Sequence, residues 1–157
     1  MISNYKAIQV LNDLININHD RVKGYKKAAA EIKADNMDLQ ILFFKMANES
    51  WRHIIQLSRK IEILGGIPAI KNGNKGTIYK MWKDFKPTFS GEGRQSVLES
   101  CDFSEEATKK TYEIALEKDE KMDASIRRLL LSQQSSIKEW HYLVRKQRNI
   151  NKLMYSA

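Results

Sequence analysis

The chain of 157 residues is long enough for one domain with a substantial core, without disulfides or metals to hold it together. Its one cysteine, Cys101, excludes an intramolecular disulfide framework and a cysteine-rich zinc site. The formal net charge is +8, and the excess of Lys and Arg lies mainly in residues 71–94 and 121–157. A solvated helix face accounts for this charge better than a nucleic-acid surface does, so nucleic-acid binding is the less favoured interpretation.

From about residue 3 to 33, apolar residues recur at alternating steps of three and four, which predicts a long amphipathic helix. Its inner seam consists of Ile8, Leu11, Ile15, Asn18, Val22, Tyr25, Ala29 and Ile32. Asn18 is the polar member of this seam. The start of the chain lacks a basic segment followed by an unbroken apolar run. We therefore expect a cytoplasmic protein with no membrane association.

The second predicted helix covers about residues 36–64, with Asp35 or Asn36 as its N-cap and Gly65 and Gly66 as its stop. Its inner seam consists of Leu39, Phe43, Met46, Ser50, His53, Leu57, Ile61 and Leu64. No proline interrupts this range, so the helix is expected to be continuous.

Residues 65–93 hold both prolines and six of the seven glycines, which predicts a long connection over about residues 65–90. Inside it, Ile78, Trp82 and Phe85 lie at helical spacing and predict one short helix. A link of this length allows the third long helix to run parallel to the second, as in bundles with one crossover connection.

The third and fourth long helices are predicted at about residues 91–118 and 122–150. The third seam reads Leu98, Cys101, Glu105, Thr108, Tyr112 and Ala115, and the fourth reads Leu130, Gln134, Ile137, His141 and Val144. No strand-type alternation is sustained anywhere. The sequence thus predicts an all-α, ferritin-like up-down four-helix bundle, with residues 1–157 as a single domain.

Polar seam residues recur at similar spacing in the two halves. Asn18 and His53 are 35 residues apart and Glu105 and His141 are 36 apart, which suggests a degenerate internal duplication. A di-metal carboxylate bundle needs one Glu from each of two helices and Glu-x-x-His from each of the other two. The six positions here are Asn18, Ser50 with His53, Glu105, and Lys138 with His141. Three of the four carboxylates are absent, so we expect a degenerate di-metal site and no cofactor.

Iron or manganese binding stays an alternative, with Glu105, His53 and His141 as ligand candidates and Glu49 as a further one if the frame shifts by one residue. The structural interpretation is an inner polar cluster of Asn18, Tyr25, Glu105 and Tyr112 held by hydrogen bonds across the core. In that case Asn18, Tyr25 and His53 are the expected donors to Glu105. No residue has an expected catalytic role.

The second helix is apolar beyond one seam, because Leu42, Phe44, Trp51, Ile54 and Ile55 widen its hydrophobic surface. A helix that is apolar around more than about a third of its circumference usually buries a second face. We therefore predict a homodimer. The alternative is that Trp82 and Phe85 of the connection cover this face within the chain.

A succession of motifs spans nearly the whole chain: LNDLI, DRVKGYKKAA, LGGIP, YKMWKDF, LESCDFSEEATKKTYEIAL and SIKEWHYLVRKQR. It resembles a bacterial ferritin-like family catalogued as a domain of unknown function, within the superfamily of ferritin and rubrerythrin. The resemblance implies an up-down bundle with a long second connection and supplies no activity. Where metal-binding relatives would place glutamates, this chain has Asn18, Ser50 and Lys138.

The sequence leaves three classes of function open. The first is a non-catalytic bundle that acts through self-association or an unidentified protein partner, favoured by the incomplete ligand set. The second is a metal-dependent oxidoreductase or an iron- or manganese-handling protein. The third is a basic protein associated with nucleic acid, whose affinity would fall steeply with salt.

Overall fold

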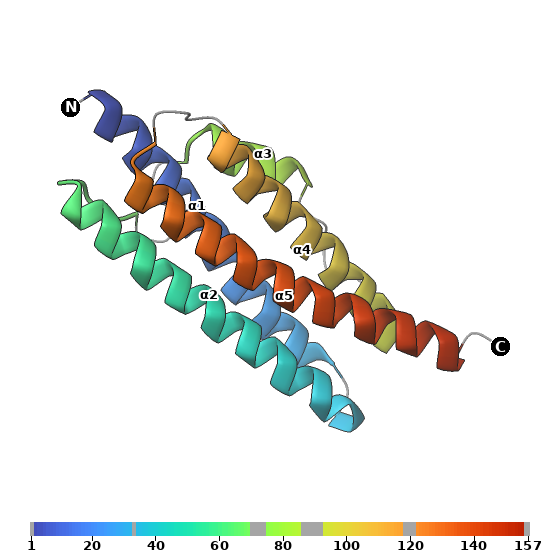
Figure 1. Ribbon diagram of the computed structural model, residues 1–157. Helices are drawn as coiled ribbons and strands as arrows, with labels where there is room; N and C mark the ends of the chain where they lie inside the picture. Colours follow the sequence, from blue (N-terminus) through green and yellow to red (C-terminus); the bar gives the residue numbers. More distant parts are fainter. Residues whose placement is uncertain (1, 33, 70–74, 86–92, 118–121, 156–157) are drawn as a thin grey trace.

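The computed structural model describes residues 2–32, 34–69, 75–85, 93–117 and 122–155 (Figure 1). Every regular element among them is helical. The long helices are α1 (Ile2–Glu31), α2 (Met37–Ile63), α4 (Arg94–Glu117) and α5 (Ala124–Tyr155). Two short elements complete the fold: the 3-10 turn η1 (Ala34–Asn36) before α2, and α3 (Thr77–Phe85) in the second connection. None of the described helices is both long and apolar enough to cross a membrane.

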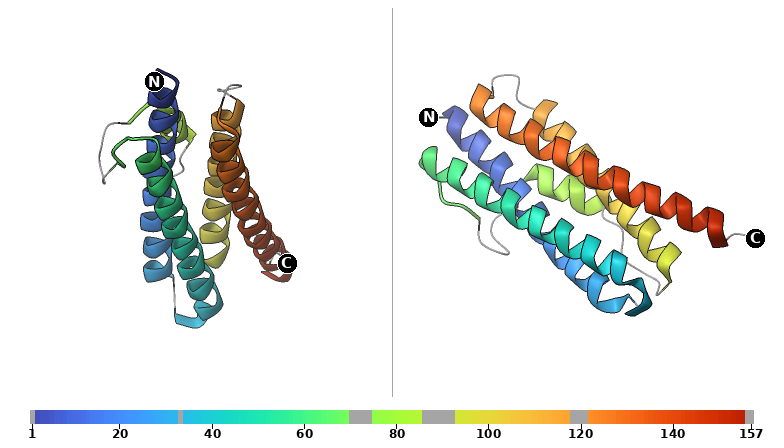
Figure 2. Two further views of the ribbon diagram at one scale, coloured as in Figure 1. Left: turned by 60° about the vertical axis from the view of Figure 1, so that its left-hand side comes forward. Right: turned by 60° about the horizontal axis from the view of Figure 1, so that its bottom comes forward.

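The four long helices form two antiparallel pairs, α1 with α2 and α4 with α5, which face each other as two layers (Figure 2). Helices α2 and α4 run in the same direction, since both begin at the lower right of Figure 1 and end at its upper left. This arrangement confirms the predicted bundle with a long crossover. The short helix α3 packs on α1 and α4.

Two apolar clusters make up the core. One cluster surrounds Leu11, Leu57 and Leu130 and includes Trp82 of α3. The other surrounds Phe43, Met46 and Leu98 near the opposite end of the bundle. Between them lies a layer of buried polar side chains, contributed by α1, α2, α4 and α5.

Helix α3 is held on α1 by the carboxylate of Asp13, a residue of α1. The side chain of Asp13, 1 % exposed, accepts hydrogen bonds from the backbone N–H of Gly76 at 2.6 Å and of Tyr79 at 3.2 Å. Asp13 therefore supplies acceptors for donors that the first turn of a helix leaves unpaired. This contact directs α3 to α1 and α4, so α3 does not cover the outer face of α2. The side chain of Phe85, expected to help cover that face, lies outside the described residues.

The helix ends follow local sequence signals in part. Gly65 has φ +84°, and the N–H groups of Gly65 and Gly66 bond to the carbonyls of Glu62 and Ile61, which closes α2 in a Schellman turn. Asn36 precedes α2, but its side chain does not cap the helix and accepts a 2.9 Å bond from Arg94 instead. Helix α5 continues past the expected end at residue 150, where Asn151 donates a 2.7 Å hydrogen bond to Gln95 of α4.

Candidate functional site

The candidate site is the polar layer between the two apolar clusters. Helical spacing brings its members to one face of each helix, with Asn18 and Arg21 on α1, Ser50 and His53 on α2, and Glu105 on α4. All five residues are buried, with no more than 2 % of any exposed. The layer therefore excludes bulk water, and its polar groups must find their hydrogen-bond partners in one another or in the backbone.

Its centre is an ion pair between Arg21 and Glu105. The Arg21 Nε and Nη2 atoms donate to the two carboxylate oxygens of Glu105 at 3.1 and 2.7 Å, so the contact is bidentate. Both side chains are 0 % exposed. The Nη1 atom donates to Ser50 Oγ at 2.8 Å, and Ser50 in turn donates to the carbonyl of Met46. The guanidinium thus binds α2 and α4 together from α1.

The charge state of this pair follows from its surroundings. Burial lowers the pKa of Arg21, but the adjacent Glu105 carboxylate outweighs burial and leaves the pKa raised. Arg21 is therefore a permanent cation whose charge Glu105 balances. Tyr25 lies beside the pair, with its ring centroid 5.7 Å from Arg21 Cζ and 5.8 Å from the ring of Phe43. Burial, followed by the charge of Glu105, raises the pKa of Tyr25, which keeps its hydroxyl protonated.

A second group of hydrogen bonds begins at Asn18. Its Nδ2 atom donates to Tyr112 Oη at 3.0 Å and to the carbonyl of Leu14 at 2.8 Å. Its Oδ1 atom lies 3.3 Å from His53 Nδ1. The Tyr112 hydroxyl donates to Gln133 of α5 at 2.7 Å. Asn18 therefore connects all four long helices through its neighbours.

His53 leads from Asn18 to Glu49. The Nε2 atom of His53 lies 2.9 Å from Glu49 Oε1, and Glu49 also accepts hydrogen bonds from Ser136 and from Trp140 Nε1, the latter at 2.6 Å. The hydrogen bond from His53 is the main reason that the pKa of Glu49 falls to about 2. Burial is the main cause that lowers the pKa of His53, and the charge of Arg21 lowers it further. The hydrogen bond to Glu49 raises this pKa but does not cancel the two effects. The Glu49 carboxylate is therefore ionised and fully occupied by protein donors.

His141 belongs to a different cluster. Its Nε2 atom lies 2.8 Å from Asp102 Oδ1, and its Nδ1 atom lies 3.7 Å from Glu106. Arg145 and Arg148 also bind Asp102, at 3.0 and 2.6 Å. Burial raises the pKa of Asp102, but these three partners outweigh burial and lower it overall. The two histidines that the spacing argument assigned to one centre thus lie in separate networks.

The side chains of the inner layer do not fit a dinuclear iron or manganese centre. Both oxygens of Glu105 bind the guanidinium of Arg21, and Ser50 occupies a position that would need a carboxylate. Lys138, which stands at another such position, is exposed on α5. Among the described residues there is no group of three or more His, Cys, Asp or Glu side chains arranged to hold a metal ion.

Sequence analysis identified Asn18, Tyr25, Glu105 and Tyr112 as inner polar residues, and all four are buried. It did not include Arg21, the residue that binds Glu105 through both carboxylate oxygens. A signal was present, because Arg21 follows the seam residue Asn18 by three positions and so lies on the same helix face. Arginine is neither apolar nor a metal ligand, and it is rarely buried without a partner, so the seam pattern did not predict Arg21 as an inner residue.

The comparisons with known proteins agree with this fold. The family described as Domain of unknown function (DUF2383) matches residues 6–118. No curated protein matches the sequence. A solved structure of a Mycobacterium smegmatis Dps1 mutant superposes with a TM-score of 0.78 at 16 % identity, covering 92 % of this chain and 96 % of that one. At this identity the likeness concerns the fold alone, which is ferritin-like. The family match covers most of the chain, so the protein belongs to the DUF2383 family.

Proposed function

We propose that the protein is a non-catalytic, ferritin-like bundle that acts by association with other molecules, and that the protein works without a resident metal. The Arg21–Glu105 ion pair is the observation that carries this proposal. It supplies a fixed internal cation in the layer where a metal-dependent relative would need a set of carboxylates.

Electrostatics supports this assignment. One carboxylate and one guanidinium balance each other, so the centre of the layer has no negative charge left for a divalent ion. A metal bound next to Arg21 would bring two cations together in a region of low dielectric constant, at a high cost in free energy. The carboxylate of Glu49, which is partly buried, is likewise occupied by His53, Ser136 and Trp140.

The surface that we assign to association is the outer face of α2, formed by Ile41, Phe44, Trp51 and Ile55. These side chains are 40–52 % exposed and recur at steps of three, seven and four along the helix. Leu42 and Ile54, which sequence analysis grouped with them, point inward: Leu42 is half-buried and Ile54 is only 7 % exposed. An apolar helix face that no described element covers is best buried against a second copy of itself, which favours an isologous homodimer.

The remaining parts of the proposal come from the sequence. We retain a single domain over residues 1–157 and a cytoplasmic location, supported by one cysteine that is buried and free. Nucleic-acid binding stays the less favoured alternative.

Metal content and oligomeric state test the two halves of this proposal. We expect protein purified after iron or manganese loading to contain well under one ion per chain, and its melting temperature to be unchanged by chelator. Two tightly bound ions per chain, with a melting temperature that depends on them, would refute metal independence.

For the association half, light scattering of the wild type should give a dimer, and Ile55→Glu should give a monomer. Ile63→Glu is the matched control, because Ile63 is on the same helix and is 76 % exposed but is the last residue of α2, about two turns beyond Ile55. A monomeric wild type at high concentration, or equal effects of the two variants, would refute the assigned surface.

A further inference from the structure

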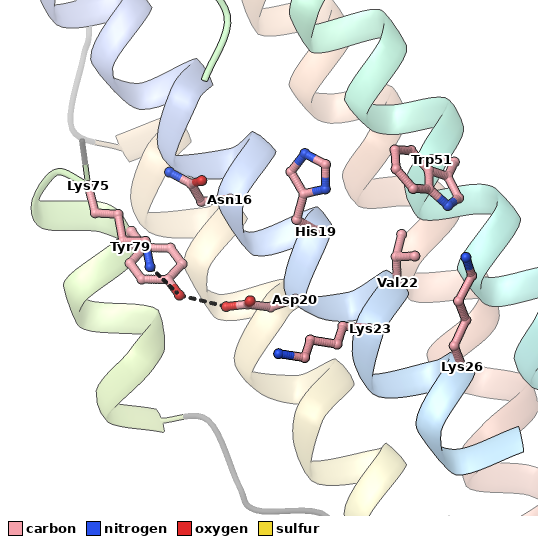
Figure 3. Close-up of a pocket in the computed structure, with 9 residues that line it drawn as sticks. All are labelled: Asn16, His19, Asp20, Val22, Lys23, Lys26, Trp51, Lys75 and Tyr79. Atoms are coloured by element: carbon pink, nitrogen blue, oxygen red, sulfur yellow. Dashed lines mark hydrogen bonds between the residues drawn. The ribbon is translucent and has the colours of Figure 1, made fainter. Parts of the chain in front are cut away.

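A basic pocket lies beside α1, between α2 and α3, away from the Arg21–Glu105 pair. It encloses about 410 Å³, a volume in the range of small-molecule sites. Its lining includes Asn16, His19, Lys23, Lys26, Trp51 and Lys75 (Figure 3). Five of these six are hydrogen-bond donors or cations, and Trp51 adds an aromatic wall.

The charge of the pocket is positive. None of the ion pairs found among the described residues includes Lys23, Lys26 or Lys75. Asp20, the one acidic residue among the described lining residues, accepts a 2.7 Å hydrogen bond from the Tyr79 hydroxyl. Three ammonium groups thus surround one carboxylate that already has a partner. Cations gathered in a concave, partly apolar site concentrate anions there.

Aromatic rings hold two of these lysines in place. Lys26 Nζ lies 5.9 Å from the ring centroid of Trp51, and Lys75 Nζ lies 4.5 Å from that of Tyr79. Trp51 also meets the ring of His19 edge-on at 5.4 Å. Such contacts restrict the lysine side chains, so less conformational entropy is lost when they bind a ligand.

The strongest pointer to a ligand is Asn16. This side chain is only 3 % exposed, yet its Nδ2 atom has no hydrogen-bond partner among the described residues. A buried donor without a partner costs about 1–3 kcal/mol, so such donors are rare in folded proteins. Asn16 lines the pocket, with Lys75 on one side of it and His19 on the other (Figure 3). An acceptor group bound in the pocket would satisfy it.

We propose that this pocket binds a small ligand with two linked phosphate groups. Lys75 and Lys26 lie at opposite ends of the pocket, with Lys23 and Asn16 between them (Figure 3). A ligand with anionic oxygens along its length would meet an ammonium group at each end, the neutral donor of Asn16 near Lys75, and Lys23 in between (Figure 3). The cations among the described lining residues are lysines, which bind phosphate oxygens as point charges.

Pyrophosphate is the probe for the test, used with the full-length protein. We expect saturable binding of one pyrophosphate per chain by calorimetry and a shift of the Asn16 side-chain amide signals in NMR spectra. The triple variant Lys23→Gln, Lys26→Gln, Lys75→Gln should bind at least tenfold more weakly. The triple variant Lys110→Gln, Lys138→Gln, Lys146→Gln is the matched control, because it removes the same charge from exposed lysines elsewhere and should bind normally.

Asn16→Leu should also weaken binding at least tenfold, and the lysine variants keep the proposal testable if this change impairs folding. Equal loss in the two triple variants, or binding without saturation, would overturn the proposal by showing general attraction of anions to a basic protein. A single-stranded oligonucleotide that binds tightly while pyrophosphate does not would also overturn it in favour of a nucleic-acid surface. None of these outcomes depends on metal content, and none requires that the outer face of α2 be buried in a dimer, although Trp51 belongs to both surfaces.

Discussion

Neutralising Glu105 tests the buried ion pair most directly. Glu105→Gln keeps the size of the side chain but leaves the fully buried guanidinium of Arg21 as an unbalanced charge. Removing one partner of a buried ion pair costs about 3–5 kcal/mol. For a chain of this size, this corresponds to a fall in melting temperature of about 6–20 °C. From the sequence alone, with a hydrogen-bonded but unpaired Glu105, the same change would cost only about 1 kcal/mol.

The assay is urea unfolding followed by circular dichroism, with Glu113→Gln on the exposed face of α4 as the matched control. We expect the control to stay within about 0.5 kcal/mol of the wild type. The double variant Arg21→Met, Glu105→Gln should be more stable than Glu105→Gln alone, because it removes the stranded charge. A cost of only about 1 kcal/mol for Glu105→Gln, or a double variant that equals the sum of the single ones, would refute the reasoning.

Three further predictions concern other parts of the fold. Gly76→Ala should cost about 1–3 kcal/mol in urea unfolding. The new Cβ would lie 2.7 Å from Asp13 Oδ2, and Asp13 is buried and held by the N–H groups of Gly76 and Tyr79, so it is not free to move away. Gly93→Ala, whose Cβ would meet nothing within 4 Å, is its control. Glu49 has a folded-state pKa of about 2 against 4.5 when unfolded, so its contribution is complete above pH 4.5 and is lost as pH falls toward 2. Glu49→Gln should therefore make stability less dependent on pH in that window, and an unchanged slope would contradict the assignment. Burial raises the pKa of the Cys101 thiol, so the native protein should resist iodoacetamide and react only on unfolding; rapid alkylation of the folded protein would show that the thiol is accessible.

Some of the inner site was predictable because helical periodicity is local. The steps of three and four residues placed Asn18, Glu105 and Tyr112 on inner faces, and all three are fully buried. A second local signal, the glycine stop, located the end of α2 at Gly65, where a positive φ favours glycine. These features depend only on residues within a few positions of one another, so one sequence contains the necessary information.

The choice of partners depends on how the helices pack, and only the tertiary structure decided it. Asn18 meets His53 and Tyr112, whereas Glu105 meets Arg21, and His141 lies with Asp102. Spacing alone had suggested one centre shared by both histidines. Periodicity determines which face of a helix a side chain occupies, but the axial offset and crossing angle between helices determine which side chain lies opposite. An inner arginine is stable only if that offset delivers a carboxylate to it, because burial of an unpaired cation costs far more free energy than helix propensity can supply.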